Sequence, residues 1–165
     1  MSDTHTGGCQ CGAVRFRVRG KLGTASICHC RMCQKAFGGF YAPLVGVDEA
    51  SGVTWTRGAP KWFQSSNVAR RGFCADCGTP LTYEAPDGLA LAIGAFDEPA
   101  RVAPVIQYGV EAKLPYADAV PGLPERTTEQ DEDAAAFLAS IVSRQHPDHD
   151  TDTWPPVHPG ATDNT

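Results

Sequence analysis

The sequence carries little charge, and positive charge is the scarcer sign. Charged residues make up 20% of the 165 residues, and 14 Lys and Arg against 19 Asp and Glu give a formal net charge of −5. Non-specific attraction to nucleic acid needs clustered Lys and Arg that neutralise phosphates. We therefore expect no nucleic-acid partner.

Long hydrophobic runs are absent as well. No stretch approaches the roughly 18 apolar residues of a membrane span, and residues 1–6 lack the basic start and apolar run of a secretory signal. These absences predict a cytoplasmic protein without a membrane partner. In that reducing compartment the seven cysteines are not expected to form disulfides. Ligand spacing and compartment favour zinc over an iron–sulfur cluster.

Three of the cysteines lie almost side by side in the chain. Cys28, Cys30 and Cys33 place three thiols within six residues, close enough to hold one metal ion. Thiolate is a soft ligand that suits zinc, and a zinc ion with three protein ligands keeps a fourth position for water or substrate. The triplet predicts an open, catalytic zinc site.

The other four cysteines form two pairs, Cys9 with Cys11 and Cys74 with Cys77. The pairs lie far apart in the sequence, as they do in many closed four-thiolate zinc sites. A glycine follows each pair directly and permits the tight turn of a metal knuckle. These pairs predict a closed, structural site beside the open one.

Short strands dominate the region that holds the cysteines. Residues 13–19 alternate apolar and charged side chains, which predicts a strand with Val14, Phe16 and Val18 inward, and glycines at 20 and 23 predict a hairpin into the cysteine triplet. Strand 69–73 is expected to carry the second cysteine pair to the first by strand pairing. Pro43 predicts an edge or bulged strand at 40–47. Further strands are predicted at 53–56, 61–65, 80–84, 89–93 and 105–108, and a short helical turn at 34–39.

The strand pattern predicts a mainly β fold with one domain over residues 1–127. Residues 128–144 predict a C-terminal helix packed on or beside it, capped by Thr128 and followed by acidic residues. Its apolar face would be formed by Phe137, Leu138, Ile141 and Val142. Residues 145–165 are rich in Pro and Asp and predict a disordered tail, in which His146, His149 and His158 are solvated.

Three motifs carry a family resemblance. Gly-Cys-Gln-Cys-Gly-Ala-Val at 8–14, Cys-His-Cys-Arg-Met-Cys-Gln at 28–34 and Cys-Ala-Asp-Cys-Gly-Thr-Pro-Leu at 74–81 together resemble the glutathione-dependent formaldehyde-activating family, which includes the centromere protein V domain. The resemblance covers roughly residues 5–126 and includes all seven cysteines in order. Lys113-Leu114-Pro115-Tyr116 resembles the late motif of the family, with Tyr116 where many members carry Trp.

The resemblance implies a small, zinc-bound, β-tent-like sheet fold with two Zn²⁺ per chain. It implies that the structural zinc is held by Cys9, Cys11, Cys74 and Cys77, and the catalytic zinc by Cys28, Cys30 and Cys33. The implied activity is condensation of formaldehyde with glutathione to S-hydroxymethylglutathione, a carbon–sulfur lyase reaction in either direction. A small thiol and an aldehyde would be the partners, although fold-level analogy does not determine the substrate.

The chemistry of such a site leaves several roles open. Zinc could activate the glutathione sulfur as a thiolate, polarise the aldehyde oxygen, or hold the hydroxyl group of the adduct. Three thiolates on Zn²⁺ carry a formal charge of −1, so nearby cations are expected. Arg31 and Lys35 flank the triplet and are predicted to bind the carboxylates of glutathione, with solvated surface cations as the alternative.

Two further side chains are candidates at the site. His29 lies between two ligands and would point away from them in an extended stretch, which favours packing or proton transfer over ligation. Tyr116 could close over the site, by the resemblance. The competing functions are a non-catalytic zinc-binding interaction module and a thiol-rich metal buffer or redox sensor with an exposed triplet. The sequence leaves the oligomeric state open.

Overall fold

The computed structural model describes residues 3–48, 51–131 and 134–155. Within these residues ten strands form two sheets, and the mainly β prediction is confirmed. The smaller sheet has the order β1-β2-β5, with bounds Thr4–Gly8, Arg15–Arg19 and Val53–Arg57. Among the described residues, no helix is both long enough and apolar enough to cross a membrane.

The larger sheet has the order β10-β3-β4-β9-β8-β7-β6. The bounds of its strands, in that order, are Ile106–Tyr108, Leu22–Cys28, Ala42–Val47, Gly88–Ala92, Pro80–Ala85, Arg70–Phe73 and Lys61–Gln64. All neighbours are antiparallel except β10 and β3, which are parallel. Helix α1 (Arg31–Phe37) follows β3 directly, so the cysteine triplet spans the junction of a strand and a helix.

Strand β2 shows why the alternating sequence folds as it does. Val14, Phe16 and Val18 are buried as predicted, and Phe16 packs edge-on against Phe96 and Trp55, with ring centroids 5.1 and 6.1 Å apart. These side chains belong to the core between the two sheets. Burial of such aromatic and aliphatic side chains is the main source of stability in a small β domain.

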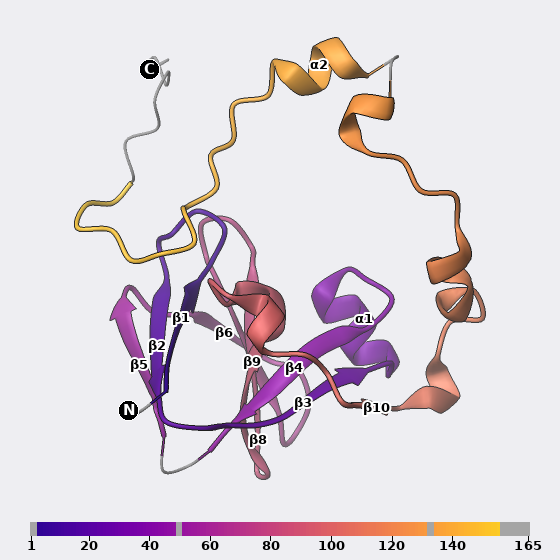
Figure 1. The fold of residues 1–165 in the computed structure, drawn as a ribbon. Coiled ribbons are helices and arrows are strands. Elements are labelled where there is room, and N and C mark those ends of the chain that lie inside the picture. Colours follow the sequence, from indigo (N-terminus) through magenta and orange to yellow (C-terminus); the bar gives the residue numbers. More distant parts are fainter. Residues whose placement is uncertain (1–2, 49–50, 132–133, 156–165) are drawn as a thin grey trace.

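Two predictions about strand pairing are wrong. The predicted hairpin does not form, because β2 belongs to the smaller sheet and β3 to the larger one (Figure 1). Strand 69–73 does not pair with the first cysteine region either, since β7 pairs with β6 and β8. The cysteine pairs lie instead in the connections β1–β2 and β7–β8, one from each sheet, and these connections contact each other. Alternation along a strand specifies its buried face but not its neighbour.

Of the two alternatives for the strand with Pro43, the edge position is wrong, because β4 lies between β3 and β9. A register shift is present in its pairing with β3, but it falls between Leu22 and Ala25 of β3 and not at Pro43. Pro43 is opposite Ile27 in β3, but pairing with β9 begins only at Leu44. The proline therefore lies beyond the ladder on the β9 side, where its missing N–H group interrupts no pairing.

The predicted helix over 128–144 is reduced to two short pieces, η5 (Thr128–Gln130) and α2 (Ala135–Ala139). The capping residue is Thr127, whose side chain forms a capping box with Gln130.

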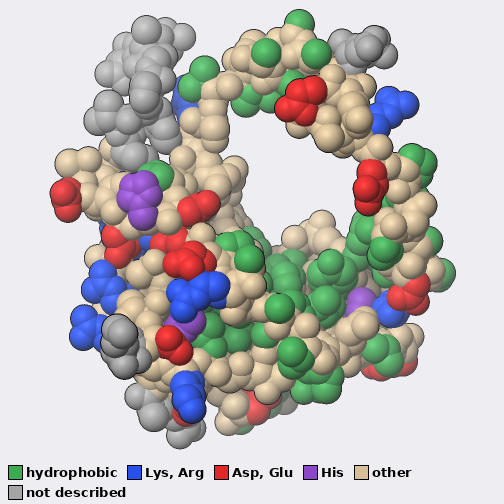
Figure 2. All heavy atoms as spheres, viewed as in Figure 1, with side chains coloured by type: hydrophobic (Ala, Val, Ile, Leu, Met, Phe, Trp, Pro, Cys, Tyr) green, Lys and Arg blue, Asp and Glu red, His purple; other side chains and the backbone are tan. Residues whose placement is uncertain are grey.

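The chain after Gly109, which also holds η3 (Val110–Ala112) and η4 (Ala117–Gly122), forms an arc that stands away from the sheets (Figure 1). Figure 2 shows open space between arc and sheets. Phe137 is 68% exposed, and a short helix without a packed apolar face gains little stability.

The predicted disordered tail is corrected for the part that the structure describes. Residues 145–155 return from the arc to the first cysteine pair, and the side chain of His146 is buried. The backbone N–H of His146 donates to the Gln10 carbonyl over 2.7 Å, and the Trp154 indole N–H donates to the Cys11 carbonyl over 2.8 Å. A composition poor in apolar residues predicted no packing, but this segment is held by polar contacts. His149 is exposed, and His158 lies outside the described residues.

Candidate metal centres and adjoining cavity

Within the described residues, two groups of side chains have ligand atoms that all lie within 4.8 Å of one another. The first group is formed by Cys9, Cys11, Cys74 and Cys77. The distance between the sulfurs of Cys9 and Cys11 is 3.5 Å, and that between Cys11 and Cys74 is 3.8 Å. Four sulfurs at about 2.3 Å from one zinc ion in a tetrahedron would lie about 3.8 Å apart. The four thiols thus have the spacing of a closed tetrahedral site.

Two similar turns present these sulfurs. Gly12 and Gly78 have φ angles of 79° and 77°, which favour glycine, and each donates its N–H to the carbonyl of the first cysteine of its pair over 3.0 Å. The Val14 N–H donates to the Cys9 sulfur over 3.2 Å. The Gln10 N–H donates to the Thr79 hydroxyl over 3.0 Å and joins the two turns. Local backbone conformation therefore places two sulfurs per turn, and tertiary contacts place the turns side by side.

The thiols of this group differ in acidity. Burial raises the pKa of the Cys9 thiol above its ordinary range. Burial also opposes ionisation of Cys77, but hydrogen bonds from Thr79 and from Cys11 outweigh it and lower the Cys77 pKa to about 6. A thiol that ionises near neutral pH is prepared to bind a metal.

The second group is formed by Cys28, Cys30 and Cys33, at the end of β3 and the start of α1. Strand β10 supports it from outside, because the N–H of His29 donates to the Tyr108 carbonyl over 2.8 Å and Tyr108 lies opposite Cys28. A Cβ on Gly109 would meet the backbone nitrogen of Cys30 at 3.0 Å, so this position needs the small residue. Three thiols without a fourth protein donor in the group leave one tetrahedral position for another ligand.

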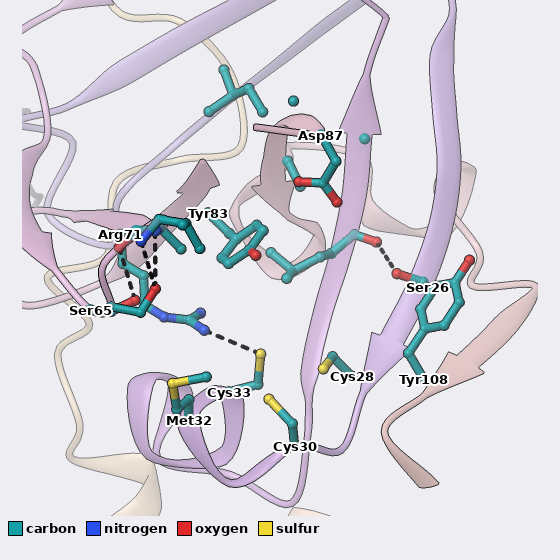
Figure 3. A pocket seen from close by; sticks show the side chains of 18 of the residues that line it. Ser26, Cys28, Cys30, Met32, Cys33, Ser65, Arg71, Tyr83, Asp87 and Tyr108 are labelled. Atoms are coloured by element: carbon teal, nitrogen blue, oxygen red, sulfur yellow. Dashed lines mark hydrogen bonds between the residues drawn. The ribbon is translucent and has the colours of Figure 1, made fainter. Parts of the chain in front are cut away.

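A cavity of about 430 Å³ opens beside this triplet. Its size lies within the range of about 300–1,000 Å³ that is usual for small-molecule sites. All three thiols line it, and Figure 3 shows their sulfurs converging at its lower edge. The opposite walls are contributed by β7, β8 and β9 and include Arg71, Tyr83 and Leu89. The walls contain both aliphatic and polar side chains, among them Leu44, Val68, Leu89, Ser26 and Ser65.

Arg71 is the cation in this wall, and no motif in the sequence marks it as a site residue. Its side chain is 8% exposed, and Nη2 donates to the Cys33 sulfur over 3.3 Å. The guanidinium lies 5.0 Å from the centroid of the Tyr83 ring. Strand alternation was the available signal, since one of two successive arginines leading into Cys74 must face the interior. Its neighbour Arg70 instead pairs with Glu84 and stacks on Trp62 at the surface.

The pKa values in the triplet follow from these contacts. Burial raises the pKa of the Cys33 thiol to about 12, although Arg71 favours its ionised form. Burial also opposes ionisation of Cys30, but the N–H of Cys33 and the neighbouring thiols outweigh it and lower its pKa. The sulfur donors of both groups have the chemistry that soft or borderline metal ions prefer.

The structure places the other predicted site residues around, rather than in, the cavity wall. His29 is buried, shares a 2.8 Å hydrogen bond with Gln107 and packs edge-on against Tyr41. Arg31 and Lys35 lie on the exposed side of α1, and Arg31 donates to Gln34 over 3.2 Å. Tyr116 is 53% exposed and contacts Phe40.

Gln34 has a structural part that the sequence did not indicate. Its side chain is buried, and Nε2 donates to the carbonyls of His29 and Ala112 over 2.7 and 3.0 Å. It thereby ties the triplet segment to the start of the arc. A polar residue one position after the last cysteine gave no sign of this role.

Fold and site together define a class of protein. It is mainly β and has one closed group of four thiols and one group of three thiols beside a cavity. Residues 4–111 match the profile of the family described as glutathione-dependent formaldehyde-activating enzyme, and the chain belongs to this family. The chain is also similar to a Rhodobacter sphaeroides protein of known crystal structure, with 21% sequence identity and a TM-score of 0.47. The matched region covers 62% of this chain and 98% of the Rhodobacter sphaeroides chain. No curated protein matches the chain.

Proposed function

We propose that the protein is a zinc-dependent enzyme that forms or cleaves a carbon–sulfur bond between a small thiol and an aldehyde. The observation that carries this proposal is the contrast between the two thiol groups. One is closed by four sulfurs, while the other has three sulfurs and opens on a cavity. Formation or cleavage of S-hydroxymethylglutathione, from glutathione and formaldehyde, is the reaction that the family description supports.

The donor sets fit zinc at both positions. Cys9, Cys11, Cys74 and Cys77 would hold a structural ion, since four thiolates complete its coordination. Cys28, Cys30 and Cys33 would hold a catalytic ion. When bound there, zinc would supply an acidified thiol or a polarised aldehyde oxygen at neutral pH.

The residues around the triplet would bind and orient the reactants. Arg71 offsets the charge of the Cys33 thiolate and so reduces the negative charge that an incoming anion meets. The aliphatic side chains of Leu44, Val68 and Leu89 would exclude water from the reacting atoms. If glutathione is the thiol, Arg31 and Lys35 are the proposed partners of its carboxylates outside the cavity. Tyr116 contacts Phe40, which follows the same helix, and is a further candidate. His29 does not line the cavity; we propose it as a proton-transfer residue.

A second candidate is an interaction module that uses its zinc sites only for folding. The arc favours it, because Val110, Leu123 and Phe137 are each more than half exposed. Exposed apolar side chains along one segment can contact a partner. This candidate predicts that loss of the triplet leaves binding through the arc unchanged.

Exchange NMR tests the proposal, because formaldehyde and glutathione also react without a catalyst. We expect the zinc-loaded protein to accelerate exchange between formaldehyde hydrate and S-hydroxymethylglutathione, and Cys30→Ser to abolish the acceleration. An absence of acceleration with glutathione and with other cellular thiols would exclude the lyase function. Two zinc ions per chain in the wild type, and one in Cys30→Ser, are the expected metal contents.

A further inference from the structure

The side chain of Arg71 is not fully satisfied by the described residues. It is more than nine-tenths buried, yet only Nη2 has a hydrogen-bond partner, the Cys33 sulfur. The Nε and Nη1 atoms have no hydrogen-bond partner among the described residues. A buried donor without an acceptor is destabilising, and more so when it is charged. The fold keeps this cost at the wall of the candidate catalytic cavity.

The contacts of Arg71 do not explain it as a structural residue alone. The other described contact of its guanidinium is the face of Tyr83, which accepts no hydrogen bond in the ring plane. No carboxylate pairs with Arg71 among the described residues, whereas the surface arginine next to it has Glu84. Beyond its contact with the Cys33 sulfur, the guanidinium thus keeps two buried donors, Nε and Nη1, that an anionic or strongly accepting ligand can satisfy.

The position of Arg71 selects which oxygen it can meet. Figure 3 shows its guanidinium extending across the cavity wall toward Cys33, above the other two sulfurs. A substrate sulfur that took the fourth ligand position beside the three thiols would lie next to the Cys33 sulfur. An oxygen one carbon away from that sulfur is then within reach of a group that already contacts Cys33 at 3.3 Å.

We propose that Arg71 forms an oxyanion subsite for the oxygen attached to the carbon that bonds the substrate sulfur. This inference rests on the proposed function and names the donor that the lyase reaction needs. The substrates it fits are hemithioacetals, the adducts of a small thiol with an aldehyde.

The electron balance of the step shows why a cation belongs there. In the forward direction the thiolate sulfur forms a bond to the aldehyde carbon, and the carbonyl π electrons move to the oxygen. The alkoxide formed beside Arg71 then takes a proton from water. In the reverse direction the hydroxyl loses that proton, the carbon–sulfur bond breaks, and thiolate and aldehyde leave. Donors placed where charge develops lower the barrier more than donors that bind the ground state.

A binding experiment tests the subsite without measuring turnover. The protein is loaded with Co²⁺ in place of zinc, and visible absorption of the cobalt–thiolate centre follows titration with mercaptoacetate and with its neutral isostere mercaptoacetamide. The acceptor of each probe lies one bond farther from sulfur than the adduct oxygen. We expect the wild type to bind mercaptoacetate at least about tenfold more tightly, because the carboxylate forms an ion pair with the Arg71 guanidinium, whereas the neutral amide only accepts a hydrogen bond from it.

The variants separate this subsite from other roles of Arg71. Arg71→Met should remove the preference and reverse it, since the three thiolates then repel the carboxylate, while mercaptoacetamide affinity changes less than about threefold. Arg70→Met is the matched control on the same strand and should leave the preference unchanged, because Arg70 faces Glu84 and Trp62. Should Arg71→Met fail to load cobalt, Arg71→Gln provides the same comparison without the charge.

Each remaining outcome decides between the proposals. Equal binding of both probes by the wild type, or an unchanged preference in Arg71→Met, would overturn the oxyanion subsite and leave the proposed function standing. Failure of both Arg71 variants to load cobalt, in folded protein, would show that Arg71 serves only to position Cys33. If neither thiol perturbs the cobalt centre of the wild type, the vacant ligand position is wrong, and the proposed function falls together with the subsite.

Discussion

The two thiol groups differ most in the distance along the chain that they close. The four-thiol group joins Cys11 to Cys74 across 63 positions and brings the two sheets together, whereas the triplet is local to one strand–helix junction. Binding a metal at the first group therefore constrains the whole fold, while binding at the second constrains only a few residues. The difference teaches that similar ligands can serve stability in one place and leave chemistry free in the other.

The largest expected effect comes from breaking the closed group. Cys74→Ser should unfold the domain, because a structural zinc contributes its binding free energy directly to folding. Cys30→Ser should keep the fold and lose one metal ion, since residue 30 is the N-cap of α1, where serine is favourable. Circular dichroism and metal analysis of both variants make the test. Similar behaviour of the two variants would contradict the division into structural and open sites.

A buried ion pair beside the closed group should give the next effect. Arg15 and Asp97 form a bidentate pair with distances of 2.6 and 2.8 Å, and both side chains are less than a tenth exposed. Asp97→Asn would leave the buried guanidinium paired only with the more exposed carboxylate of Asp150, so the loss should lie near the lower end of the about 3–5 kcal/mol that breaking a buried pair typically costs. Chemical denaturation measures this loss.

The control for this ion pair is the exposed pair of Arg70 and Glu84. Glu84→Gln should cost no more than about 1 kcal/mol, as surface pairs do. Equal losses of unfolding free energy in the two variants would show that burial does not increase the contribution of the Arg15–Asp97 pair to stability.

The two glycine turns allow a matched comparison within the closed group. Gly12 and Gly78 have nearly the same positive φ, but a Cβ on Gly12 would collide with the His146 ring, while one on Gly78 meets nothing within 4 Å. Both Gly→Ala changes should cost about 1–2 kcal/mol of backbone strain. Only Gly12→Ala should also displace residues 145–155, seen as a shift of the Trp154 indole N–H resonance. A shift of that resonance in Gly78→Ala, and none in Gly12→Ala, would contradict the docked position of His146.

The smallest expected effect is a pH dependence of the same docked segment. Burial, followed by the charges of Arg15 and Arg57, lowers the pKa of His146 below its ordinary value of about 6.5. The undocked histidine then takes up a proton first, so docking is complete above about pH 6.5 and weakens as the pH falls from there toward the lowered pKa. The Trp154 indole resonance should report this change.

Two variants identify the titrating group. His146→Asn should remove the pH dependence, and His149→Asn should retain it, because His149 is exposed. Persistence of the dependence in His146→Asn would assign it to another group.

The triplet region and β2 were largely predictable because their information is local. Three thiols within six residues lie close to one another in the fold, and the alternation of apolar and charged side chains over residues 13–19 specifies a strand and its buried face. The two cysteine pairs could also be matched, since four-thiolate sites are commonly built from paired turns with glycine. Conversely, the residues 128–144 were overestimated as a helix, because an apolar stripe predicts a helix only where a surface covers it.

The sequence by itself determined the mainly β character, the division of seven cysteines into four and three, and the turns that present them. Tertiary structure alone decided which sheet each strand joins, that Arg71 faces the cavity while Arg70 faces solvent, and that residues 145–155 lie on the first cysteine turn. The physical reason is the distance along the chain over which each interaction acts. Backbone conformation and short ligand spacings depend on neighbours in the chain, whereas ion pairs such as Arg15 with Asp97 and Asp150 form between segments that only the packed sheets bring together.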